Sequence, residues 1–275
     1  FALFSIQKVR GFTVIRRVAV ESVSEKYQVD SGYDVIGKEC LKNNIKVKQI
    51  TMPEIRRIGQ QAFFSCTTLK NAEFPKVVTV GKEAFASCSN LRRISFPKSL
   101  RSLEKGAFYK CKRANSVSFS EDSACREIPD RTFAECRQMK ILVLPDALEE
   151  IGAEAFYKCE ELTRVRLPDT LRKIGKRGFY QCGLEELHLP EHLEYIGESA
   201  FLKCKKLEYV RVPESVRMIG KWAFHGCGRL KKLEIHHDPE EVGEWITNKN
   251  CTIVCPKGSK MEAYAKSYEV NVEYL

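Results

Sequence analysis

The sequence predicts an α/β repeat solenoid, a right-handed coil of units about 23 residues long, each with one short parallel β-strand and a short helical turn on the convex side. Three observations predict this fold. Phe occupies one slot in eight successive units, Cys follows it three residues later every time, and Gly and Pro recur at a similar interval. The Phe slots are Phe63, Phe85, Phe108, Phe133, Phe156, Phe179, Phe201 and Phe224, and the Cys slots are Cys66, Cys88, Cys111, Cys136, Cys159, Cys182, Cys204 and Cys227.

The repeating unit has the pattern I-G-x-x-A-F-x-x-C-x-x-L-x-x-V-x-L-P, as in residues 151–168. Apolar residues alternate with others near its end, which is typical of a half-buried strand, and Pro ends that strand. Gly152 permits the preceding bend, and Ala155, Phe156 and Cys159 match about one helical turn. Because so short a unit cannot bury its own apolar face, we expect stacked units with a core column of Phe on Phe and Cys on Cys.

The repeats fade toward both ends of the chain. A degenerate unit with Leu41 in the Phe slot and Asn44 in the Cys slot precedes the regular ones, and a weaker one begins near Tyr27. We therefore predict that residues 1–26 form an N-terminal cap, with strands at 3–6 and 12–15. Residues 27–236 are predicted to form the solenoid of about nine units. Residues 237–275 are predicted to form a C-terminal cap with a strand at 252–256, a short helix capped by Ser259 and a closing strand at 270–274.

One unit departs from the common length. The spacing from Cys111 to Cys136 is 25 residues, against 22 or 23 elsewhere. In this unit Ser120 stands where Pro is usual, Cys125 occupies a Leu slot and Pro129 replaces Gly. We expect a loop near residues 120–127.

The composition excludes several classes of protein. With 30% charged residues, 43% hydrophobic residues and 15 Phe in 275 positions, the chain is not intrinsically disordered. Its apolar runs are shorter than the roughly 18 residues of a membrane-spanning helix, so we expect no membrane span. The chain begins at Phe1 rather than Met and shows no complete signal peptide, and we expect it to be part of a longer protein.

The 12 cysteines are better explained by packing than by chemistry. Eight share one slot beside Phe, which predicts buried, reduced thiols, whereas Cys251 and Cys255 are the candidates for a reactive or paired site. His236 and His237 favour a solvated turn over a metal site. The sequence contains no C-x-x-C pair, phosphate-binding loop, G-x-S-x-G or H-E-x-x-H motif, so we predict no enzyme activity, no catalytic or metal-binding residues and no cofactor.

The in-phase A-F-x-x-C units resemble the BspA-like leucine-rich repeats, a surface-protein family of bacteria and some protozoa. The resemblance covers roughly residues 27–236, and Pro256-Lys257-Gly258-Ser259 followed by Tyr264 is similar to the family's usual end. It implies a leucine-rich repeat solenoid, export and display on the cell surface or secretion, and adhesion to host or matrix proteins. It implies no catalytic site and no fixed set of ligand residues.

Alternation predicts which side chains form the concave sheet face, because the residues on either side of the buried Val slot point outward together. Five basic and three acidic residues occupy these two columns, so most of the net charge of +10 lies on turns and the convex side. Arg and Tyr are favoured at binding hot spots. The candidate ligand surface comprises Arg93, Arg164, Arg166, Glu186, His188, Tyr209 and Arg211.

We predict a non-enzymatic module that binds a protein partner, such as a host or matrix protein, through the concave face. One alternative is a polyanion binder whose basic turns hold an acidic glycan; nucleic acid is the less favoured polyanion. Another is a structural spacer within a longer surface protein.

Overall fold

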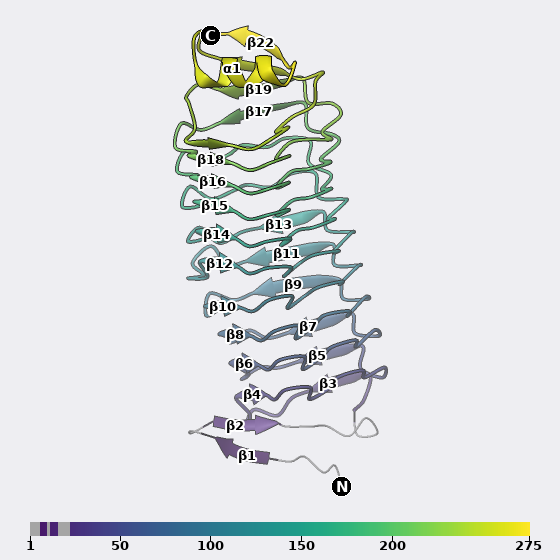
Figure 1. Cartoon of the computed structure of the whole chain (residues 1–275). Coiled ribbons are helices and arrows are strands. Elements are labelled where there is room, and N and C mark those ends of the chain that lie inside the picture. Colours follow the sequence, from purple (N-terminus) through teal and green to yellow (C-terminus); the bar gives the residue numbers. More distant parts are fainter. Residues whose placement is uncertain (1–5, 10–11, 16–22) are drawn as a thin grey trace.

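The computed structural model describes residues 6–9, 12–15 and 23–275 and shows an elongated solenoid of stacked turns, with helix α1 at its C-terminal end (Figure 1). Two columns of short strands run along the stack. Residues 3–5 of the first predicted capping strand lie outside the described residues. The second forms β2 (Phe12–Ile15), which pairs antiparallel with β1 (Ile6–Val9) and parallel with the next turn.

The longer strands form one column, here called the long-strand column. Its members are β3 (Lys26–Gln28), β5 (Gln49–Thr51), β7 (Asn71–Glu73), β9 (Arg93–Phe96), β11 (Ser116–Phe119), β13 (Ile141–Val143), β17 (Tyr209–Val212), β19 (Lys232–Ile235), β21 (Thr252–Cys255) and β22 (Asn271–Tyr274). Neighbouring strands pair in parallel and in register, so that Val117 lies between Ile94 and Leu142. The strands from β3 to β19 occupy the predicted V-x-L segments of the repeat, and β21 and β22 occupy the strand positions predicted in the C-terminal cap.

A second column, which the sequence analysis missed, consists of two-residue strands at the I-G position of each unit, where each strand ends at Ile, Val or Leu. Its members are β4 (Val35–Ile36), β6 (Arg57–Ile58), β8 (Thr79–Val80), β10 (Ser102–Leu103), β12 (Glu127–Ile128), β14 (Glu150–Ile151), β15 (Lys173–Ile174), β16 (Tyr195–Ile196), β18 (Met218–Ile219) and β20 (Glu241–Val242). Strands of two residues are too short to show an alternating pattern. The ladder along the stack, rather than local preference, therefore makes them strands.

The predicted core column of phenylalanines is confirmed. All eight Phe side chains of the repeat slot are fully buried, and consecutive rings stack with centroids 4.8 to 5.6 Å apart and interplanar angles of 1° to 15°. Offset stacks in this distance range stabilise aromatic pairs beyond simple burial. The solenoid is therefore held together along its axis by one continuous aromatic ladder.

The A-F-x-x-C segments are not helical, and the short helical turns predicted on the convex side are not confirmed. In the described residues, α1 (Lys260–Ser267) is the α-helix. Left-handed φ angles of 56° at Glu154 and 57° at Lys158 interrupt helical geometry after each bend. The amide groups of Phe156 and Lys158 instead donate to carbonyl oxygens of the following turn, at 2.8 Å each. Each segment thus forms consecutive β-turns that bond to the next unit.

The cysteine column lies beside the phenylalanine column, as predicted, and its thiols are hydrogen-bond donors. All 12 cysteines lie in the described part of the chain, where they are buried and form no disulfide bond. Each thiol of the regular Cys slots donates to a carbonyl oxygen of the preceding turn; for example, Cys182 Sγ lies 3.1 Å from Phe156 O. Burial raises the pKa of the Cys111 and Cys136 thiols, and it raises that of Cys227 to about 12. The slot therefore combines a small apolar filler with a donor to the neighbouring turn.

The irregular unit contains the predicted loop, in a shorter form. Glu121 and Asp122 are exposed in a turn, and Ser123 Oγ donates to Leu100 O at 3.1 Å, which holds the end of the loop against the preceding turn. Cys125 is buried in its Leu slot. Because β12 already begins at Glu127, the loop ends before residue 127.

At the C-terminal end, β21, α1 and β22 occur where the sequence predicts them, and Ser259 Oγ accepts a hydrogen bond from Glu262 N at 3.1 Å. The strand ladder continues beyond His236, because β20 pairs with β18 and β21 pairs with β19. Stacking therefore extends into the segment assigned to the cap. No helix within the described residues is long and apolar enough to cross a membrane.

Candidate binding surface

The outward-pointing side chains of the long-strand column form a surface, here called the long-strand face, on which the seven predicted ligand residues lie. Four of them, Glu186, His188, Tyr209 and Arg211, line one hollow of about 680 Å³. The hollow lies between residues 185–191 and 206–213 of two successive turns. Arg164 and Arg166 belong to the turn before it, and Arg93 lies apart from it, in a separate hollow.

The hollow coincides with an interruption of the long-strand column. The two turns between β13 and β17, residues 163–167 and 185–189, form no strand although the structure describes both. In the second of them the chain is one residue shorter between Cys182 and Leu184 than in other units. Gly183 occupies this tight connection, where an added Cβ would lie only 2.3 Å from Glu160 O. The shortened turn accompanies the loss of regular pairing and the opening of the surface.

Charged groups around the hollow are partly paired. Arg164 contacts Glu186 at 3.1 Å, and Lys206 contacts Glu185 at 2.8 Å. The Lys206 ammonium, by hydrogen bonding and by charge, lowers the pKa of the Glu185 carboxyl. Tyr209 is 47% exposed although it lies in a strand. The pKa of Tyr209 is raised mainly because its hydroxyl is desolvated and, to a smaller extent, because the hydroxyl forms a hydrogen bond to Glu234.

Arg93 lies over a second hollow, of about 640 Å³, near the N-terminal end of the same face. Ala72 occupies the slot that other units fill with Val, Ile or Leu, so its small side chain leaves a depression over the apolar core. Asn71, Glu73 and Ser95 form polar walls around it. The seven predicted residues therefore belong to two regions of the long-strand face rather than to one site.

The sequence analysis did not assign several residues to the ligand surface that lie in or near the hollow between residues 185–191 and 206–213. Lys206, Glu208 and Arg229 line the hollow from positions just outside the alternating strand segments. Ile141 and Val143 expose 55% and 41% of their surface on β13. Both are outward positions of the repeat, so their exposure follows from the same alternation that identified the arginines.

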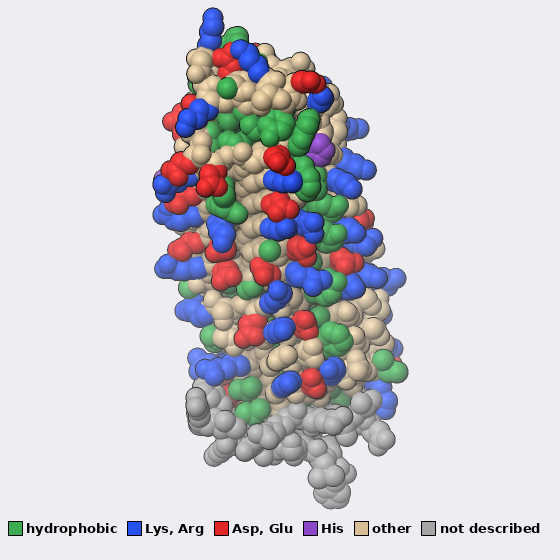
Figure 2. Space-filling view, in the orientation of Figure 1, with side chains coloured by type: hydrophobic (Ala, Val, Ile, Leu, Met, Phe, Trp, Pro, Cys, Tyr) green, Lys and Arg blue, Asp and Glu red, His purple; other side chains and the backbone are tan. Residues whose placement is uncertain are grey.

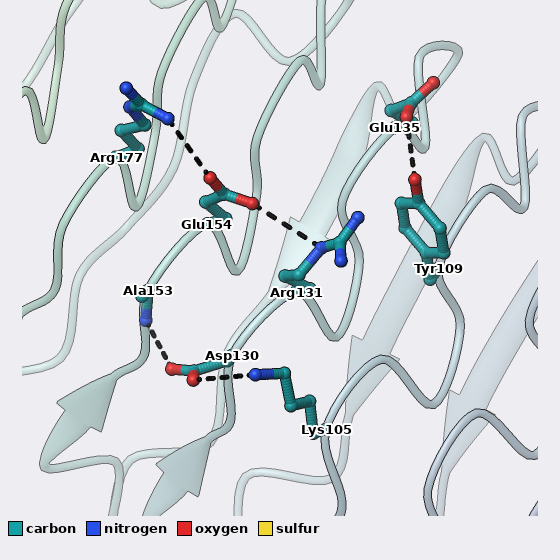
Figure 3. Close-up of polar contacts among 8 residues, drawn as sticks. All are labelled: Lys105, Tyr109, Asp130, Arg131, Glu135, Ala153, Glu154 and Arg177. Carbon is teal, nitrogen blue, oxygen red and sulfur yellow. Dashed lines mark hydrogen bonds and ion pairs between the residues drawn. The ribbon is translucent and has the colours of Figure 1, made fainter.

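Basic residues on the turns are largely engaged with neighbours. In the cluster of Figure 3, Lys105 contacts Asp130 at 3.5 Å, and the Glu154 carboxylate lies between Arg131 and Arg177, 3.5 Å from each. Acidic and basic side chains are interspersed along the face shown in Figure 2. These contacts neutralise part of the positive charge that the sequence places on the turns.

The structure does not place any three His, Cys, Asp or Glu side chains of the described residues in a group that could hold a metal ion. His237 Nε2 lies 2.7 Å from Val216 O, and His236 Nε2 lies 3.3 Å from Glu234 Oε2. These two histidines therefore contact the last regular turns of the stack.

Comparison with solved structures found several similar chains. A leucine rich cell surface protein from Faecalibacterium prausnitzii is 16% identical, with a TM-score of 0.59 and a match covering 100% of this chain and 94% of that one. The pneumococcal vaccine antigen PcpA is 16% identical, with a TM-score of 0.48 and coverage of 99% and 96%. A leucine-rich repeat protein from Bacteroides ovatus is 19% identical, with a TM-score of 0.38 and coverage of 100% and 98%. The first of these similarities supports the fold.

Sequence comparison gives a closer classification. No curated protein sequence matches the chain significantly. The family model described as a BspA type leucine rich repeat region with six copies matches residues 34–125 and 126–254. This match covers most of the chain, continues beyond the predicted boundary at residue 236 and agrees with the in-phase Phe and Cys columns of the structure. The chain therefore belongs to the BspA-type leucine-rich repeat family.

Proposed function

We propose that this chain is a non-enzymatic binding module, displayed on the cell surface or secreted, that binds a protein partner through the C-terminal part of its long-strand face. The observation that carries the proposal is the hollow in which an exposed Tyr209 lies beside His188 and Arg211. Tyr and Arg side chains at the centre of an interface supply a large share of binding energy. The cell-surface location is supported by the description of the F. prausnitzii protein.

Binding can be tested with the purified chain against a panel of extracellular matrix proteins and sulfated glycans, at low and at physiological salt. We expect binding to a protein that persists at physiological salt, because a packed interface depends less on ionic strength than a polyanion complex does. A Tyr209→Ala and Arg166→Ala double variant is expected to lose this binding and to keep its melting temperature.

A matched control is available on the second strand column. Tyr195 and Arg172 line a different hollow, in which Arg172 pairs with Glu194 at 2.7 Å. The Tyr195→Ala and Arg172→Ala double variant removes the same two residue types from another face, and we expect it to bind normally. Equal loss in both double variants would refute a site on the long-strand face. Absence of binding across the panel would favour the structural spacer.

A second candidate function is supported by a separate observation. A hollow of about 410 Å³ is lined by Lys112, Arg113 and Arg137 together with Ser89, Asn90 and Gln138, and none of its lining residues is acidic. Such a site suits a sulfated or otherwise acidic glycan. This function predicts binding that falls steeply with salt and is lost on the change Lys112→Gln with Arg113→Gln, whereas the Tyr209 and Arg166 variant binds normally.

A further inference from the structure

Three exposed basic side chains occupy one column of the long-strand face on successive turns. They are Arg166, His188 and Arg211, which occupy the same slot of their units. Among the described residues, no carboxylate forms an ion pair with Arg166 or Arg211. In contrast, Arg164 in the adjacent column pairs with Glu186 at 3.1 Å. The column therefore presents two guanidinium groups that are available to a ligand.

Three arginines next to the second strand column have carboxylate partners. Arg126, Arg172 and Arg217 each contact a glutamate of a neighbouring turn at 2.7 to 2.8 Å. A guanidinium that already has a carboxylate partner offers less to a ligand. Arg166 and Arg211 on the long-strand face differ from these three arginines in this respect.

Two carboxylates near this column contact other groups. Glu234 lies opposite Arg211 in the strand register, but it contacts His236 at 3.3 Å and also bonds to the Tyr209 hydroxyl. Glu185 pairs with Lys206 at 2.8 Å. Two further glutamates line the hollow. Glu191 follows the segment 185–189, and Glu208 precedes Tyr209, so the two flank the column on opposite sides. The centre of the surface is thus basic, and its flanks are acidic.

An apolar strip adjoins the basic column. Val143 occupies the same slot as Arg166 one turn earlier, and Ile141 accompanies it on β13. Both side chains are more than two-fifths exposed, at 41% and 55%. Most outward positions on the preceding strands are polar, as in β11, where Ser116 and Ser118 occupy the two corresponding slots. A ligand that lies along the column therefore meets an apolar surface first and two guanidinium groups next.

We propose that this column binds an extended acidic segment of the protein partner, with an apolar side chain on Ile141 and Val143 and two carboxylates on Arg166 and Arg211. The inference rests on the proposed function and adds which chemical groups of the protein partner the surface binds. Carboxylates match the planar donor set of guanidinium groups. Stacked strands are about 4.8 Å apart, so three turns from Val143 to Arg211 span about 14 Å, which an extended chain covers in about four residue steps of roughly 3.3 Å.

The spacing defines a probe that can be tested directly. A fluorescently labelled peptide carries Val, then Glu two and four residues later, with Ser between them, so that all three side chains point to one face of the extended chain. It is compared with its counterpart in which both Glu are Gln, and both peptides have a solubilising tail. Fluorescence anisotropy at physiological salt measures the two dissociation constants. We expect the Glu peptide to bind at least tenfold more tightly than the Gln peptide, and the change Arg166→Gln with Arg211→Gln to abolish that difference.

The matched control changes two arginines that already have partners, Arg172→Gln with Arg217→Gln, and is expected to keep the preference. Equal affinity for the two peptides, retention of the preference in the Arg166 and Arg211 variant, or binding of a sulfated oligosaccharide but neither peptide would overturn the inference. If a protein partner binds in a Tyr209-dependent way while the Glu peptide does not bind, the inference fails and the proposed function stands.

Discussion

Replacing Phe156 by Ala tests whether the aromatic ladder holds the solenoid together. Phe156 is fully buried, and its ring stacks on Phe133 at 5.6 Å and on Phe179 at 5.1 Å, with an interplanar angle of 12° in both pairs. Truncating a buried Phe to Ala costs about 3 to 5 kcal/mol. Each lost stack contributes about 0.5 to 1.5 kcal/mol beyond burial, so we expect a loss in the upper half of that range.

Urea unfolding followed by circular dichroism measures this loss. Phe64→Ala provides a control of the same chemistry, because Phe64 is only half-buried, with the Lys42 ammonium 5.5 Å from its ring centre. Because Phe64 is partly exposed, the loss expected for the control is smaller, about 1 to 2 kcal/mol. A loss below about 1 kcal/mol for Phe156→Ala, or equal losses for the two variants, would refute the ladder as the main source of stability.

Three further predictions concern backbone fit and ionisation. Gly183→Ala should lower the free energy of unfolding by about 1 to 3 kcal/mol, because the added Cβ would lie 2.3 Å from Glu160 O. Gly228 also directly follows a Cys of the repeat, but an added Cβ there has no heavy atom within 4 Å, so Gly228→Ala should leave the melting temperature unchanged. Equal shifts of the melting temperature by calorimetry would contradict this. Burial raises the pKa of Cys227 to about 12 from its usual 9.0. Under reducing conditions the contribution of this thiol to the free energy of unfolding should therefore be constant below pH 9 and fall from pH 9 to 12. The free energy of unfolding should fall less steeply over this range in Cys227→Ala, and a flat profile from pH 9 to 12 in urea titrations would refute the prediction. Hydrogen bonds from Lys266, the Gly258 amide and Tyr274 lower the pKa of Glu262 from 4.5 to about 2. The amide protection factors of residues 259–274, which correct the exchange rates for their intrinsic pH dependence, should therefore fall as the pH falls from 4.5 to 2. Glu262→Gln should show lowered protection factors at neutral pH, and unchanged protection factors would count against the prediction.

The sequence alone predicts the elements that repeat at fixed slots. The Phe column, the long strands and the helix capped by Ser259 were predictable because each depends on a residue type whose physical role is local. The geometry of the A-F-x-x-C segment was not. Its left-handed positions are occupied by residues as different as Glu154, Trp222 and Lys158, so no residue type marks them.

The hollow shows where sequence reasoning reaches its limit. Units of 22 residues follow both Cys66 and Cys182, but only the second one is shortened between its Cys and its Leu. Comparing the Cys-to-Leu offsets, rather than the Cys-to-Cys spacings, would have pointed to Gly183. Whether the arginines of the long-strand face have partners was not readable at all, because it depends on the directions of long side chains such as Arg164, which turns toward Glu186.

Site-specific cross-linking tests most directly the central claim that a partner binds on the long-strand face. A photoreactive phenylalanine analogue is placed at Tyr209 or, as the matched position on the second strand column, at Tyr195, and each protein is irradiated with the partner found in the binding panel. Tyr209 lines the hollow of the long-strand face, and Tyr195 lines a hollow on the second column. Covalent capture from position 209 and not from position 195 is the predicted result. Capture from position 195 alone, or equally from both positions, would contradict a binding site on the long-strand face.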